Sequence, residues 1–175
     1  MSKTINILIL ITIDTDAVRK NYPNPSKNSG SPTGIGHNMG YMVATGTTIN
    51  SGQGTGDLSF TALVGDTVRA FATSGSDNFE DAVLLYGMPR FSGAQVFGPF
   101  NYQNFTKSTV LPNSVTAVLP AVIADEMFWF YQASVSTKGT EGYMVQFALY
   151  TRDTNTGQPV LFGYYAWDPT ITVAG

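Results

Sequence analysis

The sequence offers few side chains for nucleophilic or metal-centred chemistry. It contains one histidine, His37, and no cysteine, which excludes cysteine catalysis, thiolate zinc sites and disulfide bonds. A Ser-His-Asp triad would have to use His37, which lies in a stretch rich in proline and glycine. The motifs G-x-S-x-G, H-E-x-x-H and G-x-x-x-x-G-K-[ST] do not occur. The sequence therefore predicts a protein that is not an enzyme and uses no cofactor.

Carboxylates gather in one short segment that could offer oxygen ligands to a metal ion. Asp77, Glu80 and Asp81 lie close together in the sequence, and calcium takes about six to eight oxygen ligands in proteins. Their spacing does not match the EF-hand pattern. We therefore regard these three residues as weak calcium candidates, and the alternative is that they are solvated acids in a turn.

Three other acidic residues are placed to organise loops. Asp14 and Asp16 follow the first apolar run and precede a long irregular stretch, 21–38, and Asp168 lies between a tryptophan and a proline. Short carboxylate side chains accept hydrogen bonds from nearby backbone amides. We predict that Asp14, Asp16 and Asp168 hold the loops beside them.

Aromatic residues are concentrated in two clusters, 128–131 and 162–167. A sugar site combines the apolar face of an exposed ring with directed hydrogen-bonding groups. If the protein binds such a ligand, we expect the contacts to come from the irregular stretch and from these clusters: Tyr22, Asn24, His37, Asn38, Trp129 and Trp167. The alternative is that the aromatic clusters pack in the core.

Short strands separated by turns must position these side chains. The apolar run 5–13 is rich in β-branched residues and has the length of a strand, which predicts a strand buried on both faces. Gly65-Asp66 predicts a hairpin turn, and 153–157 predicts another. The remaining strands are predicted at 41–49, 58–62, 68–73, 82–86, 95–97, 126–135, 143–151 and 159–167.

The pattern of elements indicates the fold class. No window of helical length carries an apolar stripe at helical spacing. The stretch 21–38 is rich in proline, glycine and asparagine, and an irregular loop of that length is usually functional or disordered. We predict that the chain, 1–175, is one all-β domain, an antiparallel β-sandwich or jelly roll with one long irregular loop after the first strand.

Composition narrows the choice of partners. Only 12% of the residues are charged and the formal net charge is -3, whereas an average soluble domain has about 25% charged residues. A surface poor in charge associates readily, so we expect the chain to bind itself. No basic patch for nucleic acid is present. The run 5–13 is too short to cross a membrane and lacks a cleavage site after it, which favours a cytoplasmic protein without a membrane partner.

Several segments together resemble the PixA/AidA inclusion-body protein family of bacteria. They are INILILITIDTD, NYPNPS, PTGIGHNMGYM, GQGTGDLSFTALVGD, DAVLLYG, GTEGYMVQFALYT and LFGYYAWDPTITV, which follow one another from Ile5 to Val173. The resemblance implies an intracellular protein with a β-sandwich fold that accumulates as dense or crystalline inclusions. It implies no enzymatic activity and no catalytic residues.

Two hypotheses about function follow. The first is a self-associating, non-enzymatic cytoplasmic protein whose partner is another copy of itself, as an oligomer or an inclusion. The alternative is a lectin-like module that binds carbohydrate or another small ligand.

Overall fold

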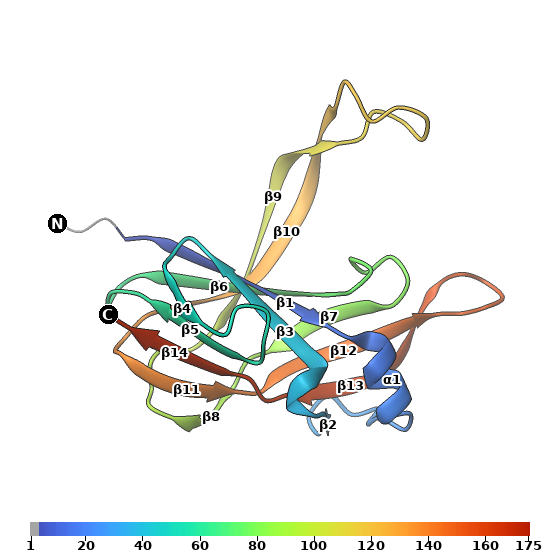
Figure 1. Ribbon diagram of the computed structural model, residues 1–175. Coiled ribbons are helices and arrows are strands. Elements are labelled where there is room, and N and C mark those ends of the chain that lie inside the picture. Colours follow the sequence, from blue (N-terminus) through green and yellow to red (C-terminus); the bar gives the residue numbers. More distant parts are fainter. Residues whose placement is uncertain (1–3) are drawn as a thin grey trace.

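Strands make up most of the computed structural model, which describes residues 4–175 (Figure 1). They form three sheets with the orders β3-β1-β6-β10-β9, β4-β5-β14-β11-β8 and β2-β13-β12-β7. The predicted all-β fold is confirmed. The elements in chain order are β1 (Asn6–Ile13), α1 (Thr15–Asn21), β2 (Thr33–Gly34), the 3-10 turn η1 (His37–Met39), β3 (Gly40–Thr45), β4 (Ile49–Ser51), β5 (Asp57–Thr61), β6 (Thr67–Ser74), β7 (Ala82–Gly87), β8 (Arg90–Gly93), β9 (Asn101–Leu111), β10 (Val122–Ser134), β11 (Gly139–Tyr143), β12 (Val145–Arg152), β13 (Pro159–Trp167) and β14 (Thr170–Ala174).

The first sheet buries one face of β1. Ile7, Ile9, Ile11 and Ile13 are at most 1% exposed, whereas Leu8, which points the other way, is 39% exposed. Side chains alternate between the two faces of a strand, so this sheet covers the core with one face only. The prediction that the strand is buried on both faces was wrong, because a continuous apolar run does not reveal whether a second layer covers its other side.

The other two sheets form the second layer of a β-sandwich, below the first sheet in Figure 1. The chain passes between these two sheets with very short connections: β11 continues into β12 after Met144, and β13 continues into β14 after Asp168 and Pro169. Large buried side chains of this layer belong to the same core as the isoleucines of β1: Phe60, Phe147, Tyr165 and Trp167. Burial of these apolar surfaces is what holds the two layers together.

The strand pairing departs from the sequence prediction in two ways. Three pairs are parallel, namely β1 with β6, β2 with β13 and β5 with β14. The hairpin predicted at Gly65-Asp66 is absent, because β5 belongs to the second sheet and β6 to the first. Turn residues specify a change of direction and not the sheet that the chain enters next. The hairpin predicted at 153–157 is confirmed, since it joins the antiparallel pair β12 and β13.

The single strand predicted at 143–151 is two strands in different sheets. Tyr143 ends β11 and pairs with Arg90 on β8, while Val145 begins β12 and pairs with Trp167 on β13. Tyr143 and Val145, on the two sides of the break, are both buried. The pattern could not reveal the break, because each side of it is buried in the same way.

A helix that the pattern did not predict, α1, begins directly after β1. Asp14 is its N-cap and accepts a hydrogen bond from the amide of Ala17 at 2.9 Å. Val18 is fully buried and anchors the helix to the core. A helix of 7 residues is too short to show a periodic apolar stripe, which is why the sequence gave no signal for it.

The long loop predicted after the first strand is present and packs along β13. The carbonyl of Ser26 accepts a hydrogen bond from the amide of Tyr164, and the amide of Ile35 donates to the carbonyl of Ala166, both at 2.9 Å. At Gly163 a Cβ atom would lie 2.3 Å from Cγ of Pro25, so the loop sits directly on the strand. Much of the loop therefore serves as a cover for one edge of the third sheet.

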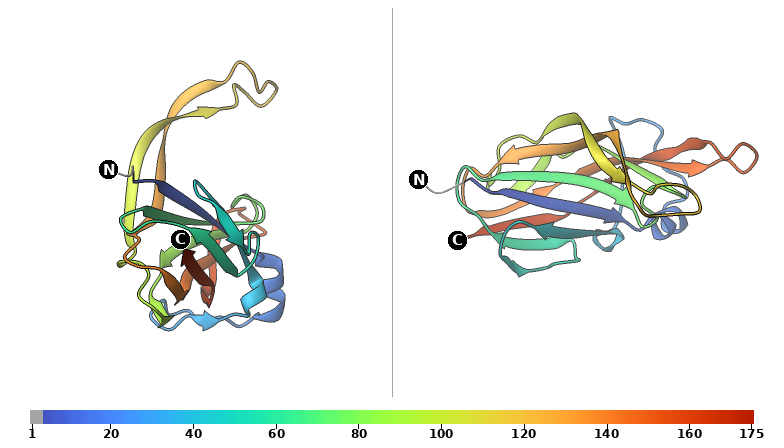
Figure 2. Two further views of the ribbon diagram at one scale, coloured as in Figure 1. Left: turned by 60° about the vertical axis from the view of Figure 1, so that its left-hand side comes forward. Right: turned by 90° about the horizontal axis from the view of Figure 1, so that it is seen from above.

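A hairpin of β9 and β10 projects from the sandwich (Figures 1 and 2). The two strands pair from Asn101 opposite Gln132 to Leu111 opposite Val122, but β10 pairs with β6 only over 131–134. None of the residues 101–130 is buried. We call this segment the arm. The sequence pattern indicated a strand at 126–135 and none at 101–111.

Candidate functional site

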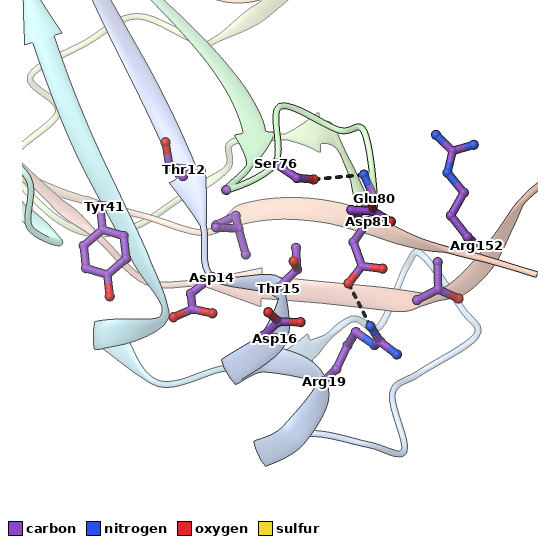
Figure 3. A pocket seen from close by; sticks show the side chains of 13 residues that line it. Thr12, Asp14, Thr15, Asp16, Arg19, Tyr41, Ser76, Glu80, Asp81 and Arg152 are labelled. Carbon is purple, nitrogen blue, oxygen red and sulfur yellow. Dashed lines mark hydrogen bonds and ion pairs between the residues drawn. The ribbon is translucent and has the colours of Figure 1, made fainter.

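A cavity opens where β1 ends and α1 begins (Figure 3). Its volume is about 740 Å³, and its lining comes from the end of β1, from α1, from β3, from the connection between β6 and β7, and from the end of β12. Most of the lining side chains carry hydroxyl, carboxylate or guanidinium groups. They include Thr12, Asp14, Thr15, Asp16, Arg19, Tyr41, Ser76, Glu80, Asp81 and Arg152.

An ion pair joins two sides of this cavity. Nη1 of Arg19 lies 3.1 Å from Oδ2 of Asp81, and the Asp81 side chain is 10% exposed. The helix α1 is thereby fixed to the segment that follows β6. Because Asp81 is shielded from water, loss of Arg19 would leave a carboxylate without its charge partner.

Asn78 shapes the connection between β6 and β7. Its Oδ1 accepts hydrogen bonds from the amides of Ser74 and Val83 at 3.0 and 2.9 Å, which closes the connection into a tight loop. Asp77 and Asn78 have φ angles of 55° and 60°, in the left-handed region that asparagine and aspartate tolerate better than most residues. This local structure presents Glu80 at the cavity, where its amide donates to Oγ of Ser76 at 3.0 Å.

The three calcium candidates do not gather into a ligand cluster. Asp81 is paired with Arg19, and Oδ1 of Asp77 accepts a hydrogen bond from the hydroxyl of Thr73 at 3.3 Å. Within residues 4–175, no three acidic or histidine side chains are grouped so that they could hold one metal ion. Asp77 and Glu80 are exposed, as the alternative of solvated acids in a turn expects, whereas Asp81 is buried and paired with Arg19.

The second guanidinium of the cavity binds backbone carbonyls. Arg152 donates to the carbonyl of Phe79 from Nη2 at 2.7 Å and from Nε at 3.1 Å, and to the carbonyl of Gly157 from Nη1 at 3.2 Å. It therefore fixes the end of β12 against the connection between β6 and β7. The cavity wall is built by these contacts and needs no ligand to form.

The cavity offers many groups that can bind a polar molecule. Its four carboxylates and two guanidiniums give a formal charge of -2, and no histidine lines it. The ring of Tyr41, which is 41% exposed, lies at one side of the group in Figure 3, and the acids and Arg19 lie beyond it. An exposed ring beside many hydrogen-bonding groups suits a polyhydroxylated molecule.

The single histidine lies in a different place, between two carboxylates. Nε2 of His37 is 3.2 Å from Oδ2 of Asp57, and Nδ1 is 3.4 Å from Oδ1 of Asp168. Nδ1 is also 3.1 Å from the carbonyl oxygen of Asp168, which can only accept, so Nδ1 carries a proton. The indole N–H of Trp167 donates to the carbonyl of His37 at 2.7 Å.

These contacts change the pKa of His37. Partial burial acts to lower the pKa, but the charges of Asp57 and Asp168 and their contacts with the ring outweigh it, so the pKa is raised. The pKa of Asp57 is lowered, chiefly by a hydrogen bond from the hydroxyl of Thr170 and also by His37. The ring of His37 therefore links three chain segments, namely the turn η1, the start of β5 and the turn before β14.

The six predicted ligand-binding residues do not form one site. The hydroxyl of Tyr22 accepts a hydrogen bond from the amide of Gly36 at 2.7 Å, so this side chain orders the long loop. Trp167 is completely buried and has no face for a ligand. Asn24 and Asn38 are exposed. Trp129 lies on β10 in the first sheet, with its ring centroid 6.4 Å from that of Tyr102.

The three acids predicted to organise loops all lie at junctions. Asp14 caps α1, and Asp16 is exposed in the first turn of the same helix, so both act on a helix and not on the long loop. Asp168 contacts His37 and thereby ties the turn before β14 to that loop.

Sequence reasoning identified only four of the thirteen residues that line the cavity, namely Asp14, Asp16, Glu80 and Asp81. Arg19, Tyr41 and Arg152 come from three separate parts of the chain and have no neighbour in the sequence that marks them as part of a site. The placement of α1, which was not predicted, brings Arg19 to the connection between β6 and β7.

Comparisons with known proteins agree on one family. The family model described as PixA, inclusion body protein, matches residues 3–173. The chain is 32% identical to an inclusion body protein of the PixA family from Burkholderia cenocepacia J2315, over 99% of this chain and 98% of that one, with a TM-score of 0.77 between the two structures. No curated protein sequence matches the chain. Within residues 4–175, no helix is long and apolar enough to span a bilayer.

Proposed function

The chain belongs to the PixA family of inclusion body proteins, and from that premise we propose that it is a non-enzymatic protein that associates with itself and accumulates in the cytoplasm as oligomers or inclusions. The proposal needs a surface through which copies of the chain can bind one another. It is supported by the arm, which carries the largest concentration of exposed apolar side chains in residues 4–175.

The distal half of the arm is apolar and fully accessible. Six of its side chains are between 65% and 103% exposed: Val110, Val115, Val118, Leu119, Ile123 and Met127. We call this group the arm tip. Exposed apolar side chains gathered on a segment that extends away from the body are typical of an interaction site. Burial of a single side chain of this size is worth roughly 1.5–3 kcal/mol, so contact with a partner would stabilise the arm.

The experiment that tests this proposal measures the mass of the native protein. Light scattering coupled to size exclusion should give a mass above that of the 18.8 kDa chain, and the mass should rise with protein concentration. Electron microscopy of expressing cells should show dense bodies in the cytoplasm. A monomer at every concentration, in cells without such bodies, would contradict the proposal.

A second candidate function is the binding of a carbohydrate in the cavity beside α1. The observation that favours it is the combination of the half-exposed Tyr41 ring with the carboxylates, hydroxyls and guanidiniums of the cavity. This function is compatible with the first. The cavity lies at the C-terminal end of β1 and is lined by residues outside the arm, so the two functions use different residues.

Binding to a glycan array, followed by calorimetry with and without calcium, tests the second candidate. Tyr41→Ala should weaken any binding found, since it removes the ring on which a sugar would stack. Phe91→Ala is a matched control, because Phe91 is 50% exposed on β8, away from the cavity. Equal weakening by both variants, or no binding by the wild-type chain, would dispose of this candidate.

A further inference from the structure

The first sheet has an apolar row on the side that faces away from the core. Leu10 lies directly opposite Val43 on β3 and Phe71 on β6, so their side chains are neighbours on one face. Leu8 extends the row and is 39% exposed, and Val43 is 40% exposed. We call these four residues, Leu8, Leu10, Val43 and Phe71, the outer face. The second layer of the sandwich packs against the opposite face of the same sheet.

The arm lies on the same side of the molecule as the outer face. Figure 2 shows in both views that the arm rises from the first sheet and bends back over the body. It does not rest on its own outer face, since Leu8 and Val43 remain exposed together with the arm tip. One chain thus presents two apolar surfaces that face the same space.

Each surface carries a single charge, and the two charges have opposite signs. Residues 109–124, which include most of the arm tip, contain no acidic or basic side chain. Asp125 follows them and lies on the same face of β10 as Ile123 and Met127. On the outer side of the first sheet, Arg69 lies opposite Leu8 and donates from Nε to Oε1 of Gln132. The two surfaces are complementary, because their contact removes apolar area from water and their charges are of opposite sign.

The backbone of the arm indicates that its partner is a protein and not a lipid. β9 is the last strand of its sheet, and residues 122–130 of β10 have one edge without a partner in the described part of the chain. Open strand edges do not occur in the hydrocarbon region of a bilayer, because nothing there satisfies the free N–H and C=O groups. Water or another protein can satisfy them.

We propose that the arm of each copy lies across the outer face of a second copy in a two-fold dimer. This inference rests on the proposed self-association and names the surfaces that carry it. In a two-fold dimer the same contact occurs twice: the arm of each copy contacts the outer face of the other copy. Because the arm and the outer face lie on one side, two copies that face each other form both contacts at once. A standard interface of about 800 Å² per partner is a small share of the 9478 Å² that one chain exposes.

Paired variants test the two surfaces separately. The arm variant is L119D/I123D and the outer-face variant is L8D/V43D. The control is Val160→Asp, since Val160 is 45% exposed on β13 and belongs to neither surface. Sedimentation and light scattering should show a dimer for the wild-type chain and the control, and a dissociation constant raised at least about 30-fold for each of the other two variants.

Mixing the two variants gives the sharper result. A copy with an intact outer face and a copy with an intact arm can still form one of the two contacts, so the mixture should contain heterodimers although neither variant dimerises alone. Circular dichroism checks that each variant is folded. If L8D/V43D does not fold, L8T/V43T replaces it, because threonine keeps a high strand propensity while removing apolar surface.

The outcomes separate this inference from the proposed function. Wild-type association that persists unchanged in L8D/V43D or L8T/V43T would overturn the assignment of the outer face and leave self-association standing. Loss of association in both variants without heterodimers in the mixture would also overturn it. A wild-type chain that is always a monomer, whether or not it binds phosphatidylcholine vesicles, would overturn both proposals.

Discussion

His37 lies between Asp57 and Asp168, and its pKa is raised because these carboxylates outweigh the effect of partial burial. A pKa that is higher in the folded than in the unfolded protein means that folding favours the protonated ring. This contribution to stability is complete below the ordinary pKa of about 6.5 and is lost as the pH rises through the raised pKa. We expect the free energy of unfolding to fall between pH 6 and the weakly alkaline range.

Chemical denaturation of His37→Gln at the same pH values measures the size of this effect. Since His37 is the only histidine in the sequence, the variant should show a flatter dependence on pH than the wild-type chain. The side chain is 42% exposed, so solvent screening makes the difference modest. The assignment is wrong if the two proteins have the same dependence on pH over this range.

Gly40 is packed against the buried ring of Trp167. A Cβ atom at this position would lie 2.9 Å from the indole ring, which is completely buried and cannot move aside. Gly40→Ala should therefore lower the free energy of unfolding by about 1–3 kcal/mol. Gly34→Ala is the control, because nothing lies within 4 Å of its Cβ position. Denaturation midpoints of the two variants should differ clearly, and equal midpoints would contradict the packing described here.

For single residues, the sequence indicated which side chains could take part in a site but not what they do in the structure. His37 and Trp167 were both noted as ligand candidates, yet their contacts with each other and with Asp168 fix the chain. The type of a residue shows which interactions its side chain can make. Whether the side chain makes them with a ligand or with the rest of the protein depends on its burial. Burial of Trp167 depends on the second layer of the sandwich, which a local pattern does not describe.

Among the elements, α1 depends most on a single side chain. Asp14 accepts the hydrogen bond of the Ala17 amide at the first turn, and a helix of 7 residues has few other hydrogen bonds. Asp14→Ala should cost about 1 kcal/mol of stability, measured by denaturation, and faster amide exchange should be confined to α1. Asp14→Asn is the control, since asparagine is an equally good N-cap. A loss of the same size in both variants would indicate that charge, and not capping, is responsible.

Alternation explains much of what was predicted, but not all of it, since β14 alternates half-buried and buried residues and was missed. β6 alternates buried and half-buried residues along its whole length and was predicted. β9 has no buried residue, because both faces of the arm meet solvent, so it shows no contrast between two faces. Its partner β10 was predicted over 126–134 and missed only at 122–125. A strand with both faces in solvent therefore escapes a search based on core periodicity.

For the whole molecule, the arm should be dispensable for folding. None of the residues 101–130 is buried, and Trp129 is the one side chain among them that packs against the core, so the core depends little on the arm. A variant in which an Asn-Gly turn joins Gln103 to Phe130, residues that are paired across the hairpin, should keep its free energy of unfolding within about 1 kcal/mol of the wild-type value. Circular dichroism and denaturation test this. A fall of about 2–5 kcal/mol, the cost of losing a large core side chain, would show that the arm supports the sandwich.

The all-β class of the molecule could be predicted because alternation and turn residues act locally. The parallel pairs, the crossover after β5 and the layer that covers β1 could not, because they depend on contacts between distant segments. The cavity beside α1 has the same origin, since it is lined by five separate segments. The low fraction of charged residues is a property of the whole molecule that can be read directly from the sequence. It favoured self-association independently of the arm.

The loop along β13 has a consequence for the proposed accumulation at high concentration. Its hydrogen bonds to Tyr164 and Ala166 occupy backbone groups at one border of the third sheet. Borders of this kind are where β-proteins join end to end and convert into amyloid when they are crowded. At this border a neighbouring copy meets backbone groups that are already hydrogen-bonded, and not a template for fibril growth.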